Sequence, residues 1–104
     1  MKNEIDIILP NFNSAKYISK TINSVINQSF KKWKLIIVDD ASKDGAKNIL
    51  SKFKNDKRIK IYWLKKNKGA GFCRNYAIKK SNSKYVAFID SDDVWEKNKL
   101  KLQL

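Results

Sequence analysis

Residues 33–45 of the chain read WKLIIVDDASKDG, and within this stretch Leu35–Val38 is apolar at every position. An uninterrupted apolar run is typical of a strand covered on both faces, as in a parallel sheet flanked by helices. Two carboxylates, Asp39 and Asp40, follow the run directly. The stretch therefore predicts a buried strand whose carboxyl end carries acidic side chains.

Three further short runs rich in apolar residues predict strands over Ile5–Leu9, Ile59–Leu64 and Tyr85–Ile89. Pro10 cannot donate a hydrogen bond to a sheet, so we expect it to end the first of these strands. The run Ile59–Leu64 is less purely apolar than the others, which indicates a position nearer an edge of the sheet.

Apolar residues at steps of three and four predict a helix between successive strands and one more after the last strand. The predicted helices cover residues 15–26, residues 46–53, residues 72–80, and the residues from Trp95 onward. We expect Asn13 or Ser14 to cap the first of them. Strands and helices thus alternate as βαβαβαβα. The pattern indicates an α/β fold, a mostly parallel, Rossmann-like sheet with helices on both faces.

The composition narrows the class of protein further. The chain has 104 residues, no histidine and one cysteine, Cys73. A Ser-His-Asp triad, a Cys-His pair and an intramolecular disulfide are therefore excluded. The length predicts a single domain over residues 1–104. Because the chain has no apolar run of about 20 residues and no signal-peptide pattern, we expect this domain in the cytoplasm.

The net charge of +13 comes almost entirely from lysine. The lysines are spread along the chain rather than gathered in a block, which is typical of a solvated surface. We therefore expect no specific nucleic-acid partner. Weak peripheral association with the anionic inner face of a membrane is expected as a secondary property.

Five of the ten acidic residues fall in two clusters, Asp39-Asp40 and Asp90-Ser91-Asp92-Asp93. Each cluster directly follows a predicted strand, where open α/β sheets place their ligand crevice. A divalent cation would relieve the repulsion within such a cluster, and oxygen ligands favour Mg²⁺, Mn²⁺ or Ca²⁺. The alternative is that Asp39 and Asp93 only cap the helices that follow them.

Five segments, in this order and spacing, carry a family resemblance that spans essentially the whole chain. They are Pro10-Asn11-Phe12-Asn13, residues 24–30 (SVINQSF), residues 38–45 (VDDASKDG), Asn67-Lys68-Gly69 with Arg74-Asn75, and residues 90–93 (DSDD). Together they resemble a family 2 glycosyltransferase, an enzyme of the GT-A fold that uses nucleotide-activated sugars. The resemblance also implies that the first and last strands are neighbours in the sheet.

The resemblance implies a role for each of seven residues. The base pocket would be lined by Pro10, Asn11 and Phe12, and Asp40 would accept a hydrogen bond from a uracil-like imide N–H. Arg74 would meet the diphosphate or the base edge, and Asp90 would contact the ribose. Asp92 would bind Mn²⁺ or Mg²⁺. A carboxylate can only accept hydrogen bonds, which suits an imide N–H, and the guanidinium is a planar fork of donors.

The function implied is transfer of a sugar from a nucleoside-diphosphate sugar, a UDP-sugar above all, to a saccharide or lipid-linked acceptor in cell-surface polysaccharide synthesis. Family 2 enzymes are normally more than twice as long and take the acceptor site and the base for inverting chemistry from their second half. We therefore expect the nucleotide-binding part of a longer domain, with no catalytic base among these residues. The alternative is a non-catalytic nucleotide-binding or interaction module.

Overall fold

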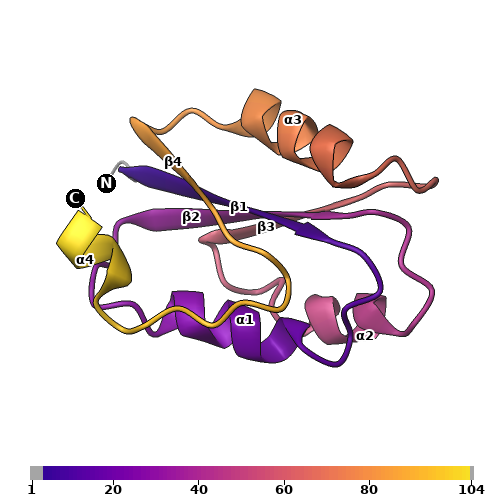
Figure 1. The fold of residues 1–104 in the computed structure, drawn as a ribbon, viewed down its shortest axis with the longest axis horizontal. Helices are drawn as coiled ribbons and strands as arrows, with labels where there is room; N and C mark the ends of the chain where they lie inside the picture. Colours follow the sequence, from indigo (N-terminus) through magenta and orange to yellow (C-terminus); the bar gives the residue numbers. More distant parts are fainter. Residues whose placement is uncertain (1–3, 104) are drawn as a thin grey trace.

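The computed structural model describes residues 4–103, in which four parallel strands form one sheet with helices on both faces (Figure 1). The predicted fold class is confirmed. In chain order the elements are β1 (Ile5–Asn11), α1 (Ile18–Ile26), β2 (Trp33–Asp39), α2 (Ala46–Ser51), β3 (Ile59–Trp63), α3 (Ala70–Lys80), β4 (Tyr85–Phe88) and α4 (Lys99–Gln103).

The strands are arranged in the order β3-β2-β1-β4. All three pairings are parallel, and β1 is paired over its whole length with β2, from Ile5 opposite Trp33 to Asn11 opposite Asp39. The strand β3 lies at an edge, and β1 and β4 are neighbours, as predicted. Residues far apart in the chain therefore meet at the carboxyl ends of β1, β2 and β4.

The two faces of the sheet are covered by different helices (Figure 1). Ile18, Ile22 and Val25 of α1 pack with Leu50 of α2 against one face. On the other face, Cys73 and Ala77 of α3 pack against Ile8, Ile36 and Val38. Because both faces are covered, the middle of β1 and of β2 has almost no exposed surface, which explains their uninterrupted apolar sequences.

Pro10 does not end the first strand, which was predicted to stop at Leu9 and instead runs to Asn11. The Ile89 N–H donates to the Ile8 carbonyl, so Ile8 and every second residue of β1 counted from it direct their backbone polar groups toward β4. Pro10, two residues after Ile8, also faces the β4 side, but the pairing of β1 with β4 ends at Ile8 and Phe88. The missing N–H of Pro10 therefore lies where the sheet needs no donor.

The last helix begins at Lys99 rather than near Trp95. The preceding segment is held extended along α1 by Gln28, whose amide donates to the Glu96 carbonyl (2.6 Å) and accepts from the Leu100 N–H (3.0 Å). These bonds occupy backbone groups that a helix from Trp95 would use internally. A buried side chain from the segment after α1 thus overrides the local helical pattern.

The first two helices are shorter than their apolar patterns. The predicted cap of α1 at Asn13 or Ser14 is wrong, because a turn in which the Ser14 carbonyl accepts from Tyr17 and Ile18 comes before the helix. Before α2, Asp44 accepts the Ala46 N–H at 3.2 Å, close to the predicted start.

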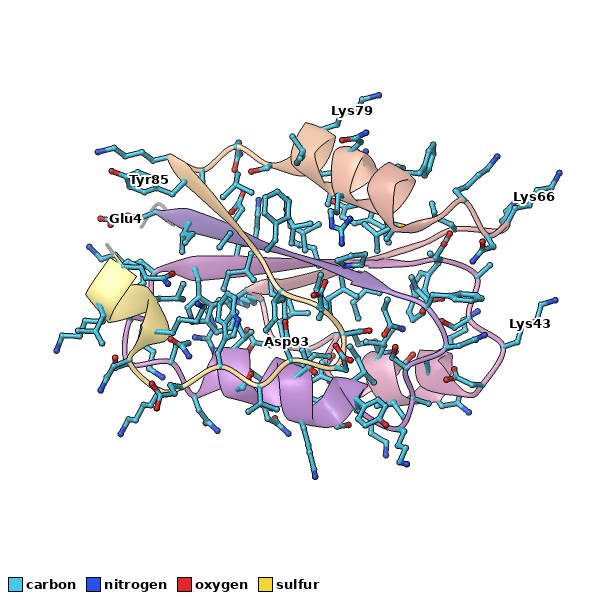
Figure 2. The ribbon with its side chains drawn as sticks, in the orientation of Figure 1. Glu4, Lys43, Lys66, Lys79, Tyr85 and Asp93 are labelled. Carbon is cyan, nitrogen blue, oxygen red and sulfur yellow. The ribbon has the colours of Figure 1, made fainter. Side chains whose placement is uncertain are left out.

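Lysine side chains extend outward from loops and helices alike, as Lys43, Lys66 and Lys79 do in Figure 2. This is the solvated distribution that the sequence indicates. Within residues 4–103, no helix combines the length and the apolar character that crossing a membrane requires.

At the amino end of β1, the fully buried Asp6 fixes the connection between α3 and β4. Its carboxylate accepts from the hydroxyls of Ser81 and Ser83, both at 2.6 Å, and from the Asn82 N–H at 3.0 Å, with the Lys34 ammonium at 3.8 Å. Burial works to raise the pKa of Asp6, but these hydrogen bonds and the lysine charge outweigh it and hold the pKa below its ordinary value of 3.8.

We predict that Asp6→Asn lowers the free energy of unfolding by about 2 kcal/mol at neutral pH, because an amide cannot accept at both positions. A depressed folded-state pKa means that the carboxylate's contribution is complete above about pH 4 and is lost as the pH falls through that pKa. The difference between parent and variant in urea unfolding should therefore shrink in acid.

The control is Glu4→Gln, which removes a half-exposed carboxylate 3.9 Å from Lys32. We expect this variant to change the free energy of unfolding by less than about 0.5 kcal/mol. Equal losses in the two variants would contradict the role assigned to Asp6.

Candidate functional site

A cavity of about 180 Å³ opens at the carboxyl ends of β1, β2 and β4, beside the first turn of α3. It is lined by Pro10, Asn11, Phe12, Asp40, Ala70, Cys73, Arg74, Asp90 and Ser91. The structure therefore brings together all six residues predicted to bind the substrate. Because β2 and β4 flank β1 on opposite sides, the cavity lies where α/β sheets commonly place a ligand.

A larger and more open groove, of about 780 Å³, runs along α1. Its lining includes Lys20, Lys31, Lys97 and Trp95 but none of the predicted site residues. Ligand sites combine an apolar wall with a few convergent polar groups of fixed position. The cavity at the strand ends meets that description with an aromatic ring, two carboxylates and a guanidinium, so it is the candidate site.

Asp40 is buried and forms one side of the cavity. Its two carboxylate oxygens accept the backbone N–H groups of Lys68 (2.6 Å) and Gly69 (2.8 Å). Gly69 has a φ of +93°, which a side chain would make unfavourable, and α3 begins at the next residue. Asp40 thus holds the start of α3 against β2, and each of its oxygens keeps a second lone pair for another donor.

Asp39 is buried behind the cavity rather than lining it. It accepts from the Asn11 amide (2.8 Å) and from the Ser42 hydroxyl (2.7 Å) and N–H (3.0 Å). Asp39 therefore joins the end of β1 to the turn after β2. The alternative that it caps the following helix is wrong, because the N-cap residue of α2 is Gly45. With its amide nitrogen bound to Asp39, Asn11 leaves its Oδ1 buried and without a partner among the described residues.

Between Asp40 and Ser42, the backbone of Ala41 has a φ of +61°. For a residue with a Cβ this left-handed conformation costs about 1–2 kcal/mol. The hydrogen bonds from Ser42 to Asp39 close the turn and hold Ala41 in it. The strained residue thus lies directly beside the cavity carboxylate Asp40.

Arg74, on the second turn of α3, lies across the cavity mouth from Asp90. The guanidinium and the Asp90 carboxylate are 3.7 Å apart, and their side chains are 42% and 65% exposed. An ion pair this long and this exposed contributes little to stability. Both groups are therefore available to a ligand at low energetic cost.

We call residues 90–93 the acidic loop; Figure 2 shows its last residue, Asp93, on the segment that follows β4. Asp93 accepts the Asp90 N–H at 3.3 Å, which ties the loop to itself. The exposed Asp92 does not line the cavity, and its carboxylate has no hydrogen bond or ion pair to another described residue. Asp93 thus acts within the loop, and Asp92 is left free.

No group of three or more carboxylates or cysteines within residues 4–103 could by itself enclose a metal ion. That is compatible with Mg²⁺ or Mn²⁺ bound together with a phosphorylated ligand, because such ions commonly take one or two protein carboxylates and complete their shell with phosphate and water. The free Asp92 carboxylate and the exposed Asp90 fit such a partial set.

Comparisons with known proteins identify relatives of this chain. Residues 6–104 match the family described as glycosyl transferase family 2. TuaG of Bacillus subtilis, a glycosyltransferase assigned by name to teichuronic acid biosynthesis, is 46% identical over 101 residues, covering 96% of this chain and 40% of that protein. WfgD of Escherichia coli, named as a UDP-Glc:α-D-GlcNAc-diphosphoundecaprenol β-1,3-glucosyltransferase, is 39% identical over 96% of this chain and 39% of its own length.

A solved structure gives the same result at the level of the fold. TarS of Staphylococcus aureus in complex with UDP-GlcNAc superposes with a TM-score of 0.90 at 36% identity, covering 96% of this chain and 30% of that one. The GT-A fold expected from the sequence is therefore confirmed. The chain spans about two fifths, or less, of each of these three proteins.

Three cavity residues, Ala70, Cys73 and Ser91, were not predicted. Cys73 is buried where α3 packs on the sheet, so its thiol gives no signal beyond core packing, and Ala70 is a small exposed residue at the first position of the helix. Burial, with the carboxylate of Asp40 nearby, raises the pKa of the Cys73 thiol to about 11. The thiol is therefore protonated at neutral pH and forms an apolar part of the cavity wall.

We predict that Cys73, the single thiol of the chain, reacts roughly a hundredfold more slowly with a disulfide reagent at pH 8 in the folded protein than in urea. Asp40→Asn should speed the reaction of the folded protein, because it removes the charge that disfavours the thiolate. Labelling of the native chain at the unfolded rate would contradict the position assigned to Cys73.

Proposed function

This chain belongs to glycosyl transferase family 2, and from that premise we propose that it binds the nucleotide of a UDP-sugar in the cavity at the ends of β1, β2 and β4. The observation that carries the proposal is the convergence of Phe12, Asp40, Arg74 and Asp90 on one cavity from four separate segments. Residues 1–104 would thus form the nucleotide-binding part of a glycosyltransferase.

The base would occupy the inner part of the cavity. Phe12 is half-exposed beside Pro10 and offers an apolar face for stacking. Two acceptors are available for a base N–H: the second lone pairs of Asp40 and the unpartnered Asn11 Oδ1. An acceptor there favours uracil, whose imide carries an N–H, over adenine, which has none at the equivalent position.

The diphosphate and the sugar would lie at the mouth of the cavity. The cavity holds about 180 Å³, whereas sites that enclose a whole ligand commonly have about 300–1,000 Å³. Only part of a nucleotide sugar therefore fits inside. At the mouth, the Arg74 guanidinium and the free N–H groups of the first turn of α3, an eleven-residue helix, favour a phosphate.

We assign Asp92, with Asp90 beside it, to hold a divalent cation, Mn²⁺ or Mg²⁺, together with the diphosphate. The support is the free Asp92 carboxylate next to a cavity-lining Asp90. When bound, such an ion neutralises charge on the departing nucleoside diphosphate. Arg74 would share that role by binding phosphate oxygens, and Asp90 would accept from a ribose hydroxyl.

The reaction proposed for the whole protein is an inverting transfer of the sugar to a saccharide or lipid-linked acceptor in cell-surface polysaccharide synthesis, on the cytoplasmic side of the membrane. The names of TuaG and WfgD support this class of process, and the complex of TarS supports a UDP-sugar donor. We assign no catalytic base among the described residues.

We predict that calorimetry detects UDP binding that is tighter than GDP or ADP binding, because adenine offers no ring N–H to the acceptors of the inner cavity and both purines are bulkier than uracil in a cavity of about 180 Å³. Replacing Mn²⁺ with EDTA should weaken UDP binding at least about tenfold, since the ion offsets the charge of the diphosphate. A preference for ADP would argue against the base site, and equal affinity in EDTA would argue against the metal.

We predict that Asp92→Asn abolishes the Mn²⁺ enhancement, because it removes a negative oxygen ligand while preserving shape. The matched control is Asp93→Asn, in the same loop, whose carboxylate is already occupied by the Asp90 N–H. The control should lose less of the enhancement. The assignment fails if Asp92→Asn behaves like the parent or if Asp93→Asn proves the more damaging change.

A further inference from the structure

Ser91 lies between the two carboxylates of the acidic loop that the proposed function uses, and two hydroxyls hold it in place. The Thr21 hydroxyl on α1 donates to the Ser91 carbonyl at 2.7 Å. The Ser14 hydroxyl, before α1, lies 2.7 Å from the Ser91 hydroxyl. Both the backbone and the side chain of Ser91 are therefore bound to one side of the fold.

Each hydroxyl has a single proton, which fixes the direction of these bonds. Thr21 also lies 3.3 Å from the Tyr17 carbonyl, but the much shorter contact to Ser91 takes the proton. The Ser14 hydroxyl donates to the Phe12 carbonyl at 3.1 Å, so Ser91 donates to Ser14. A chain of hydrogen bonds therefore links the acidic loop to Phe12, which also lines the cavity.

The two ends of the segment that contains the acidic loop are fixed by other groups. The Ile89 N–H donates to the Ile8 carbonyl, and Gln28 binds the Glu96 carbonyl at 2.6 Å. Between these points, hydrogen bonds within the loop shape it, and Trp95 packs on the core beyond the loop. The exposed Arg74–Asp90 ion pair, 3.7 Å long, holds the loop only weakly. Thr21 and Ser14 are thus the contacts that set where Asp90 and Asp92 lie relative to the cavity.

Thr21 is fully buried among Ile18, Ile22 and Val25 on the apolar side of α1. A hydroxyl in such a stripe costs desolvation that valine, of nearly the same shape, would avoid. Packing therefore gives no reason for a threonine at this position, whereas the bond to Ser91 does.

We propose that Thr21 and Ser14 are positioning residues for the acidic loop, and that their hold on Ser91 places Asp90 and Asp92 to bind a metal–diphosphate ligand. This inference rests on the function proposed above. The residues touch no ligand themselves, and they act by limiting the positions open to the two carboxylates before the ligand arrives, which lowers the ordering cost of binding.

The experiment compares Thr21→Val, Thr21→Ser and Ser24→Ala with the parent chain. Valine keeps the shape and removes the donor, serine keeps the donor, and Ser24→Ala removes another buried α1 hydroxyl, one that bonds only to the Thr21 carbonyl. We expect the Mn²⁺ enhancement of UDP affinity to be about tenfold smaller in Thr21→Val than in the parent chain. Thr21→Ser and Ser24→Ala should retain the enhancement.

The second readout needs no ligand. Amide hydrogen exchange should be faster at Asp93, whose N–H bonds to the Asp90 carbonyl within the loop, in Thr21→Val but not in Thr21→Ser, while β1 and β2 exchange as in the parent. Unchanged exchange in Thr21→Val, or faster exchange throughout the sheet, would overturn the inference. A parent that binds no UDP would contradict the proposed function, and exchange at Asp93 would still decide the positioning role.

Discussion

Two buried carboxylates that follow β2, Asp39 and Asp40, determine the arrangement of the loops around the cavity. A buried charge is tolerated only with hydrogen-bond donors around it, and the donors here come from the end of β1, the turn after β2 and the loop before α3. Asp39 takes them from Asn11 and Ser42, and Asp40 takes them from the backbone at Lys68 and Gly69. The end of β1 and the start of α3 are therefore brought to the same place, and the cavity lies between them.

A second carboxylate centre, at the opposite end of the sheet, determines where β4 enters. Asp6 binds Ser81, Asn82 and Ser83, so β4 starts beside β1 in one register. Four residues later, the chain leaves the sheet at the cavity with the acidic loop. Asp6 thus determines where the acidic loop leaves the sheet, and Thr21 and Ser14 hold it there, although the metal-binding residues proposed for the loop are themselves exposed.

The alternation of strands and helices could be predicted because local periodicity carries it, and six cavity residues because they belong to recognisable segments. The extent of β1 could not, since it depends on β4 ending before the position of Pro10. The start of the last helix depends on Gln28, which the sequence places in a recognisable segment but without a role. Thr21 did carry a signal, as a hydroxyl within an apolar helical stripe, but its partner is seventy residues away.

The measurement that tests this account most directly is a crystal structure of the chain with UDP and Mn²⁺. The account predicts uracil between Phe12 and Asp40, with the diphosphate between Arg74 and an ion bound to Asp92. Uracil outside this cavity, for example in the groove lined by Lys20, Lys31 and Trp95, would contradict it.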